Sequence, residues 1–164
     1  MASKKEFNSI YKNNHSKVYR LCMGYVTGDS ALADDLTQEV FVKVWEKMDS
    51  FRNDSEISTW IYRITVNTCL MHLRKLKRKV ETVSYELPSD IVEPVDEDNT
   101  ERLSALRKCM QKLNEIGKLL ISLKLEGVAQ KEISEITGLS NENVRVKVHR
   151  VKGQLFKCMT SKKY

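Results

Sequence analysis

The chain has 164 residues, a net charge of +6 and an isoelectric point near 9.1. That length allows one domain or two small ones. No apolar run approaches the length of a membrane span, and residues 1–9 lack the apolar core of a signal peptide. These features exclude an integral membrane protein, and we expect a soluble, cytoplasmic one.

The charge is distributed unevenly along the chain. Residues 1–80 carry a net charge of +5 and residues 102–164 carry +9, whereas residues 81–101 contain eight acidic side chains and no basic one. Two basic bodies joined by an acidic connector indicate a polyanionic partner that is held at two places. Basic proteins are common, so charge by itself does not settle the class of partner.

The cysteines and histidines show no metal-binding pattern. Cys22, Cys69, Cys109 and Cys158 are far apart in sequence, form no C-x-x-C pair and stand beside apolar residues. This context predicts reduced thiols in a protein core. The three histidines have no ligand spacing among themselves or with the cysteines, so we expect no metal site and no cofactor.

Two amphipathic helices are predicted in the first 50 residues. The first spans Phe7 to Tyr25, and the turn Thr27-Gly28-Asp29 ends it. Asp29 can cap the second, which runs from about Ser30 to Met48. The second helix has an expected inward face of Ala33, Leu36, Val40, Phe41, Val44, Trp45 and Met48.

The outer face of the second helix is acidic in an otherwise basic chain. We name this surface the acidic patch; it consists of Asp34, Asp35, Gln38, Glu39 and the apolar Val42. Such a patch would repel DNA, and an exposed Val42 favours a protein partner. Asp34 and Asp35 have a second explanation, because acids in a first helical turn also stabilise the helix dipole.

Residues 57–79 contain no Pro and no Gly and predict a helix of about six turns. Ser55 or Ser58 is expected to cap it. Apolar residues fall on two of its sides, so partners should cover both. Between them lies a polar stripe of Arg63, Asn67, Arg74 and Arg78, spaced by four, seven and four residues. This stripe indicates a nucleic-acid surface, although solvated arginines on a core helix would give the same pattern.

Residues 80–101 contain both prolines and eight acidic side chains without an apolar period. This composition predicts a flexible linker. We therefore expect an all-α protein with two small helical domains, residues 1–79 and 102–164, that fold separately.

A helix-turn-helix is predicted in the second domain. A short helix, Gln130–Thr137, is followed by Gly138-Leu139 and by a second helix that Ser140 caps. Gly138 fits the turn position that requires a positive φ. The exposed face of the second helix predicts base contacts from its centre and phosphate contacts from its flanks. The central residues are Glu142, Arg145, Val146 and His149, and the flanking residues are Lys147 and Arg150.

Three segments together resemble bacterial sigma factors. ADDLTQEVF at residues 33–41, followed by Trp45, resembles their core-polymerase-binding segment. TWIYRI at residues 59–64, with Asn67, resembles the adjacent promoter-reading segment, and residues 132–150 resemble the second DNA-binding domain. The order of the segments and their span, roughly residues 7–156, resemble the small two-domain class, the extracytoplasmic-function (ECF) sigma factors.

The resemblance implies a role for each half. The first half would open and read the −10 promoter element, and the second would read the −35 element. Phe51, Arg52, Asn53 and Asn67 lie where this family captures a base flipped from the non-template strand. The acidic patch lies where the family docks on a coiled coil of the largest polymerase subunits. Core RNA polymerase, promoter DNA and a separate anti-sigma factor are the implied partners.

Two departures and two alternatives accompany this resemblance. The chain has Leu113-Asn114 where many members have Leu-Pro, and Ser134 where Ala is usual. The DNA-facing residues vary within the family, so the promoter sequence does not carry over.

A helix-turn-helix regulator with a sensing or dimerising first half is the alternative, but no ligand pocket or dimer face is evident. An enzyme is the least expected class, because no catalytic constellation is evident in the sequence.

Overall fold

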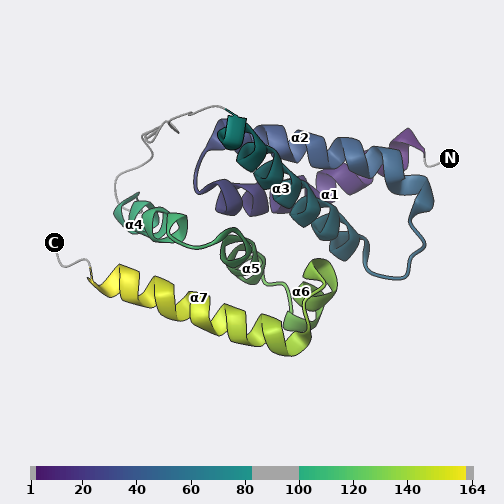
Figure 1. Cartoon of the computed structure of the whole chain (residues 1–164). Helices are drawn as coiled ribbons and strands as arrows, with labels where there is room; N and C mark the ends of the chain where they lie inside the picture. Colours follow the sequence, from purple (N-terminus) through teal and green to yellow (C-terminus); the bar gives the residue numbers. More distant parts are fainter. Residues whose placement is uncertain (1–2, 83–99, 162–164) are drawn as a thin grey trace.

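The computed structural model describes residues 3–82 and 100–161, and every α-helix in these ranges is labelled in Figure 1. The first half comprises α1 (Lys4–Val26), α2 (Ser30–Lys47), a short 3-10 turn η1 (Met48–Ser50) and α3 (Ile57–Thr82). The second half comprises α4 (Thr100–Gln111), α5 (Glu115–Leu125), α6 (Gln130–Thr137) and α7 (Asn141–Ser161). The expected all-α class is confirmed. The predicted linker falls mostly on residues 83–99, outside the described residues.

None of the helices in these two ranges has the length and apolarity needed to cross a membrane.

The ends of the first helices follow local backbone chemistry. Gly28 has a φ of +100° in the turn after α1, a conformation that glycine adopts at low cost. The Asp29 side chain accepts a hydrogen bond of 3.1 Å from the backbone N–H three residues later and so caps α2, as predicted. The predicted cap of α3 is wrong, because the helix begins at Ile57 and Glu56 occupies the preceding position.

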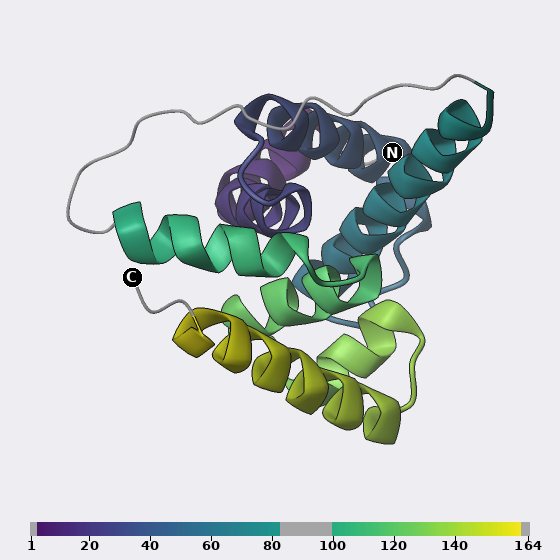
Figure 2. The same ribbon diagram turned by 60° about the vertical axis from the view of Figure 1, so that its left-hand side comes forward.

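The two halves share one apolar core. α1, α2 and α3 pack against one another, while α5 packs against α1 and α6 packs against α3 (Figures 1 and 2). Leu21, Val40 and Ile61 from the first half and Leu120 and Ile133 from the second belong to the same buried cluster. The second half therefore lies directly on the first, and α3 is covered on two sides as its apolar pattern predicted.

Gly24 and Arg20 mark the contact between α1 and α5. A Cβ added at Gly24 would overlap Ser122 Oγ and would lie 3.0 Å from Ser122 Cβ, so only glycine fits without a shift. Arg20 donates two hydrogen bonds to the Glu126 carboxylate, from Nε to Oε1 at 2.8 Å and from Nη2 to Oε2 at 2.9 Å. This hydrogen bonding raises the pKa of Arg20 above its usual value. We call this packing of the second half on the first the closed arrangement.

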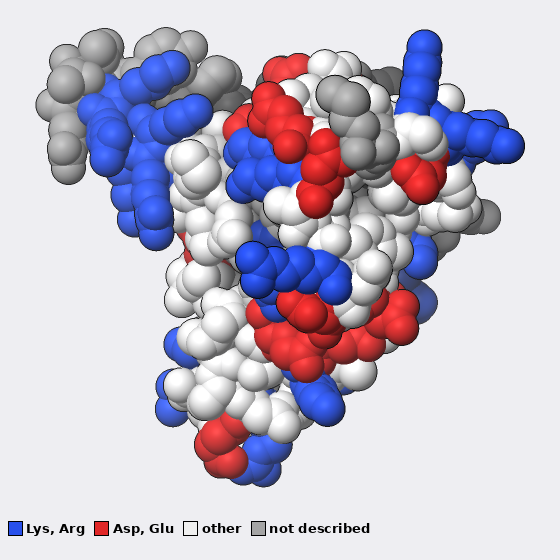
Figure 3. All heavy atoms as spheres, turned by 90° about the vertical axis from the view of Figure 1, so that its right-hand side faces the viewer, with Lys and Arg blue, Asp and Glu red and all other residues white. Residues whose placement is uncertain are grey.

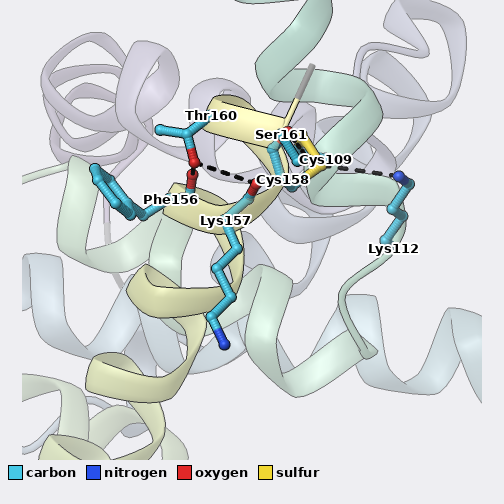
Figure 4. Close-up of a disulfide and its surroundings, with 7 residues drawn as sticks. All are labelled: Cys109, Lys112, Phe156, Lys157, Cys158, Thr160 and Ser161. Carbon is cyan, nitrogen blue, oxygen red and sulfur yellow. Dashed lines mark hydrogen bonds between the residues drawn. A yellow bond between two sulfur atoms is a disulfide. The ribbon is translucent and has the colours of Figure 1, made fainter. Parts of the chain in front are cut away.

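Two expectations about side chains are wrong. Trp45 was expected inside but is 49% exposed, because it packs at the rim of the helices against Phe7, with ring centroids 5.1 Å apart. Cys109 and Cys158 are not free thiols but form a disulfide between α4 and α7 (Figure 4). They are 49 residues apart in sequence, so only the tertiary arrangement brings them together. Cys22 and Cys69 are free and buried, as predicted.

Candidate nucleic-acid interface

The polar stripe of α3 exists, but the structure divides it into a covered and an open part. Arg63 is half-buried, and its Nη2 donates a hydrogen bond of 3.1 Å to the backbone carbonyl of Glu135 in α6. Asn67 is exposed, and within the described residues its side chain makes no hydrogen bond. The second half therefore holds Arg63, and it leaves Asn67 available to a ligand.

The last turns of α3 form a projecting basic surface. α3 extends beyond the helices that pack against its earlier turns (Figure 2). Arg74 and Arg78 are exposed there, as are the other side chains of residues 74–79. Figure 3 shows a dense group of Lys and Arg side chains at one upper corner of the molecule, apart from the Asp and Glu side chains nearer its middle. A projecting basic helix suits a run of phosphates.

The loop before α3 is anchored and presents polar side chains. The Phe51 ring packs against the Trp60 ring, with centroids 5.0 Å apart, so Phe51 is half-buried. Arg52 and Asn53 are exposed, and Asn53 has a φ of +55°, a left-handed conformation that Asn tolerates better than most residues. The aromatic pair thus fixes a loop that offers a guanidinium and an amide to solvent at the start of α3.

The acidic patch lies on the outer face of α2, as predicted. Asp34, Asp35, Gln38 and Glu39 are exposed, and Val42 is 56% exposed. Glu39 forms an ion pair with the ammonium group of Lys43 at 2.8 Å, which reduces the charge it presents to a partner. Asp34 and Asp35 form no ion pair within the described residues. The half-exposed Trp45 extends the apolar part of this surface by one turn beyond Val42.

The predicted helix-turn-helix is confirmed in α6 and α7. Gly138 has a φ of +76°, and Ser140 Oγ accepts a hydrogen bond of 3.1 Å from the backbone N–H of Asn143. Ser134, which stands where Ala is usual in the family that the sequence resembles, donates its hydroxyl to the carbonyl of Leu139 at 2.6 Å. The serine therefore braces the turn and does not disturb it.

The candidate readers of α7 are largely open to solvent. Glu142, Arg145, His149 and Arg150 are exposed, whereas Val146 and Lys147 are half-buried. Arg145 Nη2 donates a hydrogen bond of 2.6 Å to the Glu142 carboxylate, three residues earlier on the same helix. Glu142 thus orients the arginine fork in the free chain.

Two lysines beside the readers escaped prediction. Lys124 at the end of α5 and Lys152 on α7 line a pocket together with Arg145 and His149. Lys152 stands three residues after His149, so helical spacing could have identified it. Lys124 comes from another helix, and sequence spacing contains no signal for it. The pocket adds positive charge next to the predicted base contacts.

Buried ionisable groups lie below these surfaces. Burial raises the pKa of Tyr25 and Tyr62 and lowers the pKa of His72, whose Nδ1 has no hydrogen-bond partner within the described residues. The Cys22 and Cys69 thiols share a hydrogen bond, which raises the pKa of Cys69 and lowers that of Cys22. Within the same residues, no group of three or more His, Cys, Asp or Glu side chains could hold a metal ion.

Sequence comparisons match both halves to known proteins. Residues 10–79 match Sigma-70 region 2, and residues 103–155 match Sigma-70, region 4. The chain is 30% identical over 162 residues to the ECF RNA polymerase sigma-E factor of Escherichia coli K12, covering 90% of this chain and 83% of the relative. It is 29% identical to the protein of the same name from Haemophilus influenzae, covering 91% and 85%.

Solved structures share the fold. The sigma factor RpoE, solved in complex with the anti-sigma factor NepR from Bartonella quintana, has a TM-score of 0.85 at 20% identity, covering 97% of this chain and 99% of that one. CnrH, solved in complex with the cytosolic domain of CnrY, has a TM-score of 0.73 at 18% identity, covering 99% and 92%.

Proposed function

We propose how this protein acts from an established premise: the chain belongs to the ECF sigma factors, members of the sigma-70 family that start transcription through RNA polymerase. Such a factor recognises promoters and does no chemistry of its own. The roles of individual residues, the partners and the cytoplasmic location given below are our proposal for this chain.

The exposed Asn67 on α3 carries the proposal for the first half. Moving a base out of the duplex stack costs a few kcal/mol of free energy, and specific contacts to that base must offset the cost. Asn67 and Asn53 offer both donors and acceptors to a base edge, and Arg52 adds a cation. Arg74 and Arg78 on the projecting end of α3 would hold the adjacent strand by its phosphates. We assign this surface to the −10 element and to strand opening.

The recognition helix α7 is assigned to the −35 element. Arg145, oriented by Glu142, and His149 would contact base edges in the major groove, and the partly exposed Val146 would meet a thymine methyl group. Lys147 and Arg150 would contact phosphates on either side. Lys124 and Lys152 would extend the same phosphate contact.

The acidic patch is assigned to core RNA polymerase. Exposed carboxylates at Asp34 and Asp35 next to the exposed Val42 suit a protein surface better than DNA, which they would repel. Glu39 would have to exchange its ion pair with Lys43 for a contact with the polymerase.

The closed arrangement must open for this function. Arg63 belongs to the polar stripe, yet it is half-buried and bonded to α6 in the free chain. Separation of α6 from α3 would release Arg63 for DNA and expose apolar surface of the shared core. We expect core polymerase to favour the open chain. We expect an anti-sigma factor, as NepR is in the Bartonella quintana complex, to favour a form that cannot reach both promoter elements.

Run-off transcription tests the proposed function. Core RNA polymerase is incubated with fragments of the source genome, with and without the full chain. We expect discrete transcripts that depend on the chain and that start downstream of shared −10 and −35 sequences. A chain that binds duplex DNA but never stimulates core polymerase would contradict the proposal and would favour the regulator alternative.

A further inference from the structure

The disulfide between α4 and α7 lies outside every surface assigned above. We propose that Cys109 and Cys158 form a reversible redox site, which locks α4 onto α7 when oxidised and frees it when reduced. The reversibility rests on the proposed function, because a transcription factor works in a compartment where thiols are normally kept reduced.

The geometry allows the bond to form and to break. The two Cα atoms are 5.8 Å apart, within the range that a disulfide spans without backbone movement. Cys109 is buried, whereas Cys158 is half-buried, so a small oxidant can reach it. Figure 4 shows Cys158 near the end of α7. The ammonium group of Lys112 lies 3.8 Å from Cys158 Sγ. A positive charge beside a sulfur atom favours the thiolate, which is the reactive form.

The other two cysteines provide an internal contrast. Cys22 and Cys69 are both 0% exposed in the shared core and remain free thiols. Their shared hydrogen bond raises the pKa of Cys69 and lowers the pKa of Cys22, but neither thiol is open to an oxidant, because both are fully buried. Chemistry should therefore begin at the half-buried Cys158.

Hydrogen peroxide is the simplest oxidant for this pair. The Cys158 thiolate attacks one peroxide oxygen, the O–O bond breaks, and the other oxygen leaves as hydroxide, which takes up a proton to become water. The resulting sulfenic acid is attacked by the Cys109 sulfur. The S–S bond forms, the S–O bond breaks, and the thiol proton leaves with the hydroxide as a second water. Two thiols are thus oxidised by two electrons, and one peroxide is reduced to two waters.

The disulfide supplements a small apolar contact. Apart from the shared core, the described residues form a second, smaller cluster where α4, the turn after it, α5 and α7 meet. Its buried members are Met110, Leu113, Ile121 and Val151, and the partly buried Leu106 and Leu155 pack against them. The same helix α4 also lies against the end of α1. The Arg107 Cδ would lie 3.1 Å from a Cβ added at Gly28, and the Met110 Cε would lie 3.9 Å from one added at Gly24.

The redox state of this disulfide should affect how readily the two halves separate. In the oxidised chain, α7 is covalently joined to a helix that touches α1, so the closed arrangement is favoured. In the reduced chain, α4 is held on α7 only by noncovalent contacts and can move relative to α7 when the halves separate. Oxidation should therefore lower promoter output, and reduction should raise it.

The chemical test uses the full chain with wild-type cysteines. It is equilibrated in glutathione buffers of increasing oxidised fraction and then quenched with acid. Its free thiols are alkylated in denaturant, so that the buried thiols react as well, and are mapped by peptide mass. We expect four alkylated cysteines at the reducing end, and at the oxidising end a Cys109–Cys158 cross-linked peptide with Cys22 and Cys69 still alkylated. Four alkylated cysteines throughout, or a different pair, would overturn the proposal. So would a bond that the reducing buffers fail to break.

The functional test compares the wild-type chain with Cys158→Ser, which changes a half-buried position and spares the core. Amide exchange in α4 should be several-fold faster in the reduced wild type than in the oxidised one, and insensitive to peroxide in the variant. Run-off transcription should fall several-fold on oxidation of the wild type only. Equal exchange and equal transcription in both redox states would overturn the proposal. Loss of transcription in every state would count against the proposed function instead.

Discussion

At the scale of single residues, Asn67 is the side chain whose role is most sharply defined. Asn67→Ala removes the amide that we assign to the extruded base, and it leaves the fold unchanged because the side chain is exposed. We expect polymerase binding and recognition of the −35 element to persist while strand opening is impaired. Permanganate footprinting of thymines near the start site reports opening directly.

A template mismatched across the melted region provides the control for Asn67→Ala. Transcription by the variant should recover on it, since no base then has to leave a paired stack. A variant equally defective on the mismatched template would mean that Asn67 serves some step other than opening.

Arg145 and Lys147 should separate base reading from phosphate contact. Arg145→Ala should cost about 1–3 kcal/mol of binding and relax the preference at one or two base pairs. Lys147→Ala should weaken binding to all sequences more evenly and reduce the salt dependence. Fluorescence anisotropy on a set of −35 duplexes at several salt concentrations distinguishes the two effects. Equal losses on every sequence in both variants would contradict the assignment.

The exposure of a side chain could be predicted where helical spacing decides it. Contacts between segments that are distant in sequence could not. The exposed Asn67 and Val42 and the positive φ of Gly138 follow from helical period and turn chemistry alone. The contact of Arg63 with α6 and the bond between Cys109 and Cys158 depend on how the helices pack. No local pattern contains that information.

At the scale of elements, α2 connects the molecule to its proposed protein partner. Asp35→Lys combined with Glu39→Lys reverses the charge of the acidic patch at two exposed positions. We expect co-purification with core polymerase to fall strongly, with an unchanged circular dichroism spectrum. Asp54→Lys combined with Glu101→Lys makes the same change in net charge at exposed sites outside α2 and should bind normally. Undiminished association of the α2 variant would remove the basis for this assignment.

The helices themselves were largely predictable, since apolar period and Gly or Pro breaks determine where each one lies. The α2 cap at Asp29 and the α7 cap at Ser140 match the sequence prediction. The start of α3 differs, because the chain enters the helix at Ile57 without using either predicted serine. The orientation of Trp45 also differs, because the ring of Phe7 already covers its inner side.

At the scale of the whole molecule, the contact between α1 and α5 is one of the two that hold the halves together, the other being that between α3 and α6. Gly24→Leu would insert a side chain where even a methyl group overlaps Ser122, and overpacking of this kind typically costs about 1–3 kcal/mol. We expect the free chain to expand in small-angle X-ray scattering while it keeps its helices. Run-off transcription should not require Gly24, because the active form is the open one.

Gly153→Leu is the matched control for the wedge at Gly24. It makes the same substitution in a helix, and a Cβ there meets no atom within 4 Å. Its scattering profile should equal that of the wild type. If Gly24→Leu also leaves the profile unchanged, the close approach of α1 and α5 does not hold the halves together.

The sequence predicted two domains that fold separately, and that division stays a prediction. The residues that decide it lie partly in 83–99, outside the described part of the chain. Limited proteolysis should cut first between about residues 81 and 101.

No sequence pattern indicated that the two halves share a core. The apolar face of a helix has the same sequence pattern whether helices of its own half or of the other half cover it.

The most direct test of the account is the distance between the two halves in the free and the active states. Spin labels carried by an unnatural amino acid at exposed Asn13 in α1 and Gln154 in α7 leave all four cysteines intact. Pulsed electron spin measurements on the reduced chain should give one distance for the free protein, that of the closed arrangement. A longer distance should appear when core polymerase and promoter DNA are added. An unchanged distance in an actively transcribing complex would contradict the proposed opening.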